Sequence, residues 1–150
     1  MTIEETKDFT AINNFEFIDE ATGSRKIKSS GTITIERTHG IVVNLLAKIL
    51  EEKGHKVAKD RNRDLFIHNR RQITKLFEIK RGSSTTDLYS AVGQLLIYSI
   101  PIKTPVDLIL VVPEKLKTAV EKRLEKLGIK ILYYDWNNGE PTFDNLDKTI

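Results

Sequence analysis

Two carboxylates and one ammonium group are expected to converge in the middle of this 150-residue chain. Asp64 opens one apolar run, and Glu78 and Lys80 end the next, with turn-forming residues 69–71 between the runs. Residues two apart in a strand share a face, so Glu78 and Lys80 should point the same way. An antiparallel hairpin would then bring Asp64 beside Glu78 or one diagonal step from it.

Side chains of these types favour metal-dependent phosphate chemistry. Two carboxylates that lie close together repel each other, and a hard divalent cation with oxygen ligands removes that repulsion. Lys80 would orient or deprotonate a metal-bound water, or stabilise a phosphate group during transfer. The simpler interpretation of Glu78 and Lys80 is the solvated side of an edge strand.

The flanking sequence predicts the elements that must position this group. Apolar residues at helical spacing predict a helix from residue 36 or 37 to Lys53, which Gly54 ends. The other expected elements are strands at 56–59, 64–68, 73–80, 107–112 and 129–134, and helices at about 85–99 and 114–127. The order α-β-β-β-α-β-α-β predicts an α/β domain with a mixed sheet flanked by helices.

The two ends of the chain differ from this core. Alternating residues 15–19 and 32–36 predict an N-terminal β-hairpin extension over 1–35, ahead of a core over 36–135. Residues 136–150 are expected to form a turn and a loose C-terminal tail. The aromatic residues that end the last predicted strand (Tyr133, Tyr134 and Trp136) are expected to be core.

Charge and composition limit the classes of function. The net charge is +3, but residues 53–81 hold ten Lys or Arg against three acids, between acidic chain ends. A basic middle suggests a polyanionic partner, although a solvated surface explains it equally well. The absence of cysteine excludes disulfides, thiolate zinc sites and cysteine nucleophiles. No run approaches the roughly 18 apolar residues of a membrane span, and no secretory signal begins the chain, so we expect a cytoplasmic protein without a membrane partner.

The order of Asp64, Glu78-Ile79-Lys80 and Gln94-Leu-Leu-Ile-Tyr98 resembles the PD-(D/E)xK nuclease superfamily of restriction and repair endonucleases. The last string is similar to the Q-x-x-x-Y motif of the RecB-like branch, and residues 77–98 also resemble Mrr-like enzymes. The resemblance covers about residues 36–134. It implies a restriction-endonuclease-like fold and a metal-dependent nuclease, foremost a DNA endonuclease of restriction, repair or recombination type.

The resemblance also implies a role for each matching residue. Asp64 and Glu78, joined by the carbonyl of Ile79, would bind Mg²⁺ or Mn²⁺, and Lys80 would be the catalytic lysine. Gln94 would lie near that lysine or the DNA backbone. Many relatives carry a further Glu or His in the first helix.

Two positions in the first predicted helix fit that further role, and one aspartate competes with Asp64. Glu36 is our candidate metal ligand there. An equal alternative is that Glu36 only stabilises the start of the helix through the helix dipole, and His39 is more simply a surface or core histidine whose hydrogen bonds are made within the protein. The proline that gives the superfamily its name is absent, since Arg63 precedes Asp64. Asp60 lies in a charged loop rather than at a strand, so we prefer Asp64.

Side chains near the site are candidates for contacts with the DNA, most of them as cations for its phosphates. These are Arg61, Arg63, Arg70, Arg71, Arg81 and Tyr98. Because a duplex has two strands to cut and the chain has one candidate centre, a homodimer on double-stranded DNA is expected. Two other classes stay open: a catalytically silent DNA-binding module of the same fold, and a protein-interaction domain whose Glu-Ile-Lys is incidental.

Overall fold

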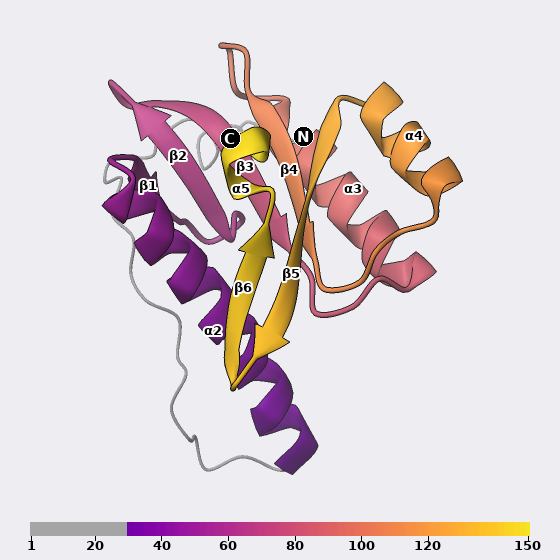
Figure 1. Ribbon diagram of the computed structural model, residues 1–150. Helices are drawn as coiled ribbons and strands as arrows, with labels where there is room; N and C mark the ends of the chain where they lie inside the picture. Colours follow the sequence, from indigo (N-terminus) through magenta and orange to yellow (C-terminus); the bar gives the residue numbers. More distant parts are fainter. Residues whose placement is uncertain (1–29) are drawn as a thin grey trace.

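A computed structural model describes residues 30–150, and side chains from residue 37 onward. The chain alternates strands and helices in the order expected for its core (Figure 1). The elements are α2 Ser30–Glu52, β1 Lys56–Ala58, β2 Leu65–Asn69, β3 Gln72–Ile79, α3 Thr85–Ser99, β4 Asp107–Val112, α4 Thr118–Lys126, β5 Ile129–Asn137, β6 Glu140–Asp144 and α5 Leu146–Thr149.

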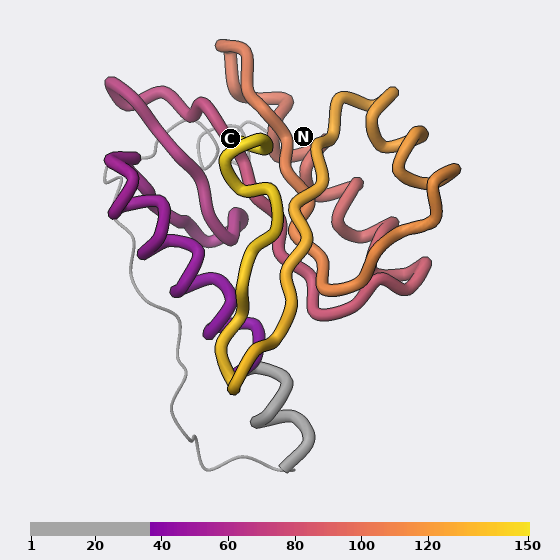
Figure 2. Tube along the Cα trace, in the orientation of Figure 1, coloured from indigo at the N-terminus to yellow at the C-terminus, as the bar shows by residue number. Residues whose placement is uncertain are grey.

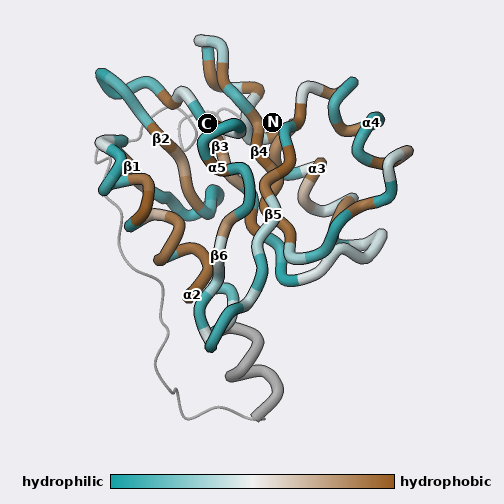
Figure 3. The backbone as a smooth tube through the Cα atoms, in the orientation of Figure 1, coloured by the Kyte–Doolittle hydropathy of each residue, from teal (hydrophilic) through white to brown (hydrophobic). Residues whose placement is uncertain are grey.

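All six strands form one mixed sheet in sequence order. Strands β1, β2 and β3 are antiparallel, β3, β4 and β5 are parallel, and β6 returns antiparallel to β5. Each parallel pair needs a crossover, and α3 and α4 provide the two crossovers. Strand β4 lies at the centre and is apolar along almost its whole length (Figure 3), as a strand covered on both faces should be.

The sheet separates two apolar cores because successive side chains of a strand point to opposite faces. Phe77 and Ile79 of β3 pack in the core under α2. Leu76 packs in the other core, with Ala91 and Leu95 of α3. The helices therefore cover both faces of the sheet, α2 on one and α3 with α4 on the other (Figure 2). The general α/β prediction is confirmed.

The predicted N-terminal hairpin is wrong in its second strand. Residues 32–36 lie in α2, which begins at Ser30, and residues 15–19 lie outside the described part of the chain. An alternation of five residues is a weak strand signal, whereas a helix already formed over the following turns extends at little cost. The predicted end is confirmed, since Gly54 follows the helix with φ +92°.

The C-terminal segment is also not a loose tail. Strand β5 continues to Asn137, and Asn138 and Gly139, with φ values of 51° and 82°, make a tight turn into β6. Asn-Gly is the strongest short hairpin signal, so the turn was recognisable and the second strand was missed. Leu146 of α5 then packs in the core under α2. Helix α4 begins at Thr118, four residues after the predicted start.

Among the described helices, even the longest, α2, lacks the sustained apolar run that would let it cross a bilayer.

The β2–β3 turn has an unusual sequence for its backbone. Asn69 pairs with Gln72, and the two residues between them, Arg70 and Arg71, have φ values of 50° and 60°. A two-residue hairpin turn with both central residues in the left-handed region favours Asn-Gly or Asp-Gly. Two arginines there are strained, so the sequence of the turn is not optimised for folding.

We expect the double variant Arg70→Asn/Arg71→Gly to raise the free energy of unfolding by about 1 kcal/mol, because it relieves this strain. Urea unfolding followed by circular dichroism would measure the change. Arg61→Asn is the matched control, since Arg61 is also exposed and its φ is not positive. A double variant no more stable than that control would contradict the turn analysis.

Candidate active site

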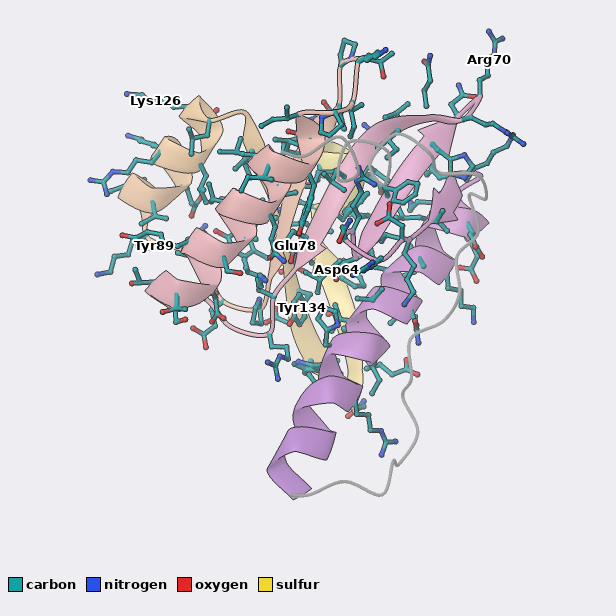
Figure 4. The ribbon with its side chains drawn as sticks, turned by 180° about the vertical axis from the view of Figure 1, so that it is seen from behind. Asp64, Arg70, Glu78, Tyr89, Lys126 and Tyr134 are labelled. Atoms are coloured by element: carbon teal, nitrogen blue, oxygen red, sulfur yellow. The ribbon has the colours of Figure 1, made fainter. Side chains whose placement is uncertain are left out.

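The β2–β3 hairpin places the two candidate carboxylates together. Leu65 pairs with Phe77, so the antiparallel register sets Asp64 opposite Glu78. The Oδ2 atom of Asp64 accepts a hydrogen bond of 3.2 Å from the backbone N–H of Ile79. The predicted convergence of Asp64 and Glu78 is therefore confirmed, and Figure 4 shows the two residues near the centre of the molecule.

Lys80 joins this pair and is held from two elements. Lys80 directly follows the end of β3, and its Nζ lies 3.0 Å from Oε1 of Glu78 on that strand. The same nitrogen donates to Oε1 of Gln94 at 2.7 Å and to Oγ of Ser90 at 3.3 Å, both on α3. The expectation that Gln94 lies near the lysine is confirmed, and Ser90 is a contact that the sequence analysis missed. Its spacing of four residues from Gln94 is the signal that would have found it.

A capping box fixes the start of the helix that carries these contacts. Ser84 Oγ accepts from the Asp87 N–H at 3.1 Å, and Asp87 Oδ2 accepts from the Ser84 N–H at 3.3 Å. Ser90 and Gln94 follow one turn apart on the same side of α3. Local sequence thus sets the register in which α3 presents two polar side chains to Lys80.

Glu78 is the most strongly perturbed acid of the site. The residue is only 5% exposed, although it ionises easily in water. Burial and the neighbouring charge of Asp64 raise its pKa to about 7, while Lys80 and His39 act in the opposite direction. A buried carboxylate with a like-charged neighbour is stabilised when it is protonated or when a cation lies beside it.

Helix α2 also reaches the site, through His39. Its Nε2 lies 3.4 Å from Oδ2 of Asp64, and both side chains are partly exposed. The sequence favoured a simple structural histidine, whereas the structure brings His39 to the carboxylates. Glu36 precedes it by one turn of α2, and its side chain lies outside the described residues.

Tyr134 fixes the strand end that carries Lys80. This buried tyrosine donates its hydroxyl to the carbonyl of Lys80 at 2.9 Å, and the Lys80 N–H donates to the Val111 carbonyl at 2.9 Å. Burial raises the pKa of Tyr134 to about 12, partly opposed by Arg81. The prediction of a core residue is confirmed for Tyr134 and wrong for the exposed Trp136. A buried tyrosine usually finds a hydrogen-bond partner, and that partner lies 54 residues away.

The candidate DNA contacts divide into near and distant groups. Arg61 lies exposed in the loop before Asp64, and Arg81 lies exposed directly after Lys80. Arg70 and Arg71 are exposed at the opposite end of the hairpin, and Figure 4 shows Arg70 far from Asp64 and Glu78. At about 3.3 Å per residue, β3 separates this turn from Glu78 by about 20 Å.

Arg63 is buried in the protein, and Tyr98 is partly buried. Arg63 is buried, forms an ion pair with Asp60, and donates to the Tyr98 carbonyl at 3.4 Å, so the expectation of a phosphate contact is wrong in this arrangement. Tyr98 is half-buried against the core under α3. Since Asp60 is held by Arg63, Asp64 is the aspartate that faces Glu78.

The donor atoms of the site fit a hard divalent cation. Asp64 and Glu78 supply carboxylate oxygens. Because burial and the charge of Asp64 raise the pKa of Glu78, a cation beside it would stabilise its charged form. The described residues contain no group of three or more His, Asp or Glu side chains placed to hold a metal ion. Mg²⁺ is commonly held by one or two carboxylates with water completing its octahedron, so two carboxylates suffice.

Comparison with known proteins finds no match, whether to a protein-family model, to a curated protein or to a solved structure.

The buried carboxylate predicts a pH-dependent stability. Because the pKa of Glu78 in the folded protein, about 7, exceeds the ordinary 4.5, the folded state binds this proton more tightly than the unfolded state. The resulting stability is complete below about pH 4.5 and is lost as the pH rises through about 7. Glu78→Gln should therefore stabilise the metal-free protein by about 3 kcal/mol at about pH 8, with little effect at about pH 4.5.

Urea unfolding in EDTA at both pH values would measure this difference. Glu140→Gln is the control, since Glu140 is exposed on β6. An equal effect of Glu78→Gln at the two pH values would show that ionisation of Glu78 does not destabilise the folded protein.

Proposed function

We propose that this protein is a metal-dependent nuclease, most directly an endonuclease that hydrolyses phosphodiester bonds of double-stranded DNA. The observation that supports it best is the position of Lys80, whose Nζ lies 3.0 Å from a buried Glu78 that faces Asp64 and 2.7 Å from Gln94. The order of helices and strands around this group agrees with a restriction-endonuclease-like core. The proposed location is the cytoplasm.

The carboxylates would hold the metal. Asp64, Glu78 and the carbonyl of Ile79 are the proposed ligands of Mg²⁺ or Mn²⁺, with Glu36 of α2 as a further candidate. A divalent cation bound there would supply the positive charge that lowers the pKa of a bound water and stabilises the phosphate during hydrolysis. Glu78 would then ionise at neutral pH, because the cation offsets both its burial and the charge of Asp64.

Lys80 is the proposed catalytic residue beside the metal ligands. Its ammonium group has three donors, and Glu78, Gln94 and Ser90 already surround it. In the reaction, the oxygen of water forms a bond to phosphorus and the bond to the leaving sugar oxygen breaks. To orient the attacking water or donate to the phosphate, Lys80 would exchange its longest contact, the 3.3 Å bond to Ser90, while Gln94 keeps its side chain in place.

The exposed cations Arg61 and Arg81, which flank the site in sequence, are proposed to contact DNA phosphates. Arg70 and Arg71 would contact the backbone further along the duplex, since the hairpin tip lies about 20 Å from Glu78. Such contacts make binding fall steeply with salt and carry no sequence information.

The decisive experiment incubates supercoiled plasmid, linear duplex and single-stranded DNA with the protein in Mg²⁺, Mn²⁺ or EDTA. We expect metal-dependent nicking or linearisation of the plasmid, and a loss of about 100-fold or more in Lys80→Ala and Glu78→Gln. Lys75→Ala is the matched control, because Lys75 lies on the same strand but forms its ion pair with Asp107 at 2.7 Å.

Each outcome separates the proposals. Cleavage that survives in Lys80→Ala, or needs no metal, would overturn this assignment of the site. Salt-dependent DNA binding without any cleavage would favour the silent binding module. If the protein neither binds nor cleaves DNA, that result would favour a protein-interaction domain.

A further inference from the structure

The outward face of α3 is apolar and carries no charge. Tyr89, Ile97 and Ile100 are 76%, 53% and 71% exposed, and they are among the most exposed large apolar side chains of the described residues. In α3 itself Asp87 is the single Asp, Glu, Lys, Arg or His, and it belongs to the capping box at the helix start. Exposed apolar residues that lie together on one helix face mark an interaction site more often than scattered ones do.

Helix α4, on the same side of the sheet, provides the contrast. Its nine residues include Glu121, Lys122, Arg123, Glu125 and Lys126. Two helices that cover one face of the same sheet thus present opposite surfaces to their surroundings, charged on α4 and apolar on α3. Contact with water explains why the outward face of α4 is charged. It does not explain why the outward face of α3 is apolar.

Gly93 lies at the centre of the apolar face. The buried residues of α3, Ala91 and Leu95, lie two positions to either side of it, so the turn of about 100° per residue points Gly93 away from the sheet. A Cβ atom added to Gly93 would meet no atom of residues 30–150 within 4 Å. Because glycine is unfavourable inside a helix and packing among the described residues does not require it here, another molecule that approaches the backbone would explain it.

The residues around Gly93 are arranged for pairing with an identical helix. Tyr89 and Ile97 lie four positions before and after it, and Thr86 and Ile100 lie seven positions before and after it. In an antiparallel pair whose two-fold axis passes through Gly93, Tyr89 therefore meets Ile97 of the other copy, and Thr86 meets Ile100. Each contact occurs twice, and no like charges face each other.

We propose that the outward face of α3 is a homodimer interface, with the two-fold axis at Gly93 and a second copy of this chain as the partner. The missing side chain at Gly93 lets the two backbones approach closely at the axis. Figure 4 shows Tyr89 on the outer side of α3, away from Glu78. The proposal does not depend on nuclease activity, since it is tested by mass and cross-linking.

The size of this surface predicts a weak dimer. A standard interface takes about 800 Å² from each partner. Helix α3 has 15 residues and is about 22 Å long, so a pair of such helices buries less than that. Association should therefore be visible at high micromolar concentration and decline on dilution.

Sedimentation velocity of the full chain, from low to several hundred micromolar, tests the association. We expect reversible dimerisation in the wild type and at least tenfold weaker association in Ile97→Glu, which places two like charges near the axis. Leu127→Glu is the matched control, because Leu127 is 50% exposed and follows α4. A monomer at all concentrations, or equal association in the two variants, would overturn the proposal.

Cysteine cross-linking locates the axis, since the natural chain has no cysteine. Gly93→Cys places one thiol at the proposed axis without a clash inside the monomer, and mild oxidation should convert most of it to a covalent dimer. Lys122→Cys, on the charged face of α4, should cross-link at least tenfold more slowly. Equal rates for the two variants would show that α3 does not pair at Gly93.

Discussion

The candidate site depends on the burial of one ionisable carboxyl group. Glu78 lies on a strand whose neighbours are apolar, and it faces Asp64 across the hairpin. Neither burial nor a second carboxylate favours its charge, which is why its pKa rises to about 7. A fold selected for stability alone would place an apolar side chain there. The protein keeps the acid, and the surrounding elements supply the groups that compensate for it.

Those compensating groups come from three separate elements. Lys80 directly follows the end of β3, Gln94 reaches in from α3, and His39 approaches Asp64 from α2. Tyr134 closes the arrangement by holding the Lys80 carbonyl from β5. Each of these contacts positions a charge or a donor rather than filling space. The sheet thus acts as a frame that brings polar side chains from distant parts of the chain to one strand end.

Helix α3 links the site to the outer surface. Ser90 and Gln94 hold Lys80 along one edge of the uncharged face that is centred on Gly93. A partner on that outer face would press on the same helix that positions the lysine. The capping box at Ser84 and Asp87 fixes which residues lie on each side, because the start of a helix sets the direction of every later side chain.

The sequence by itself determined the order of the core elements and the meeting of Asp64, Glu78 and Lys80, because alternation, turn residues and hairpin pairing are local properties of the chain. It could not determine which contacts distant elements make. The burial of Arg63 beside the Tyr98 carbonyl, the contact of His39 with Asp64 and the bond from Tyr134 to Lys80 arise from packing. The second C-terminal strand and the helical state of residues 32–36 also depended on context. Local preferences there amount to tenths of a kcal/mol per residue, and cooperative helix growth or burial against a neighbour exceeds them.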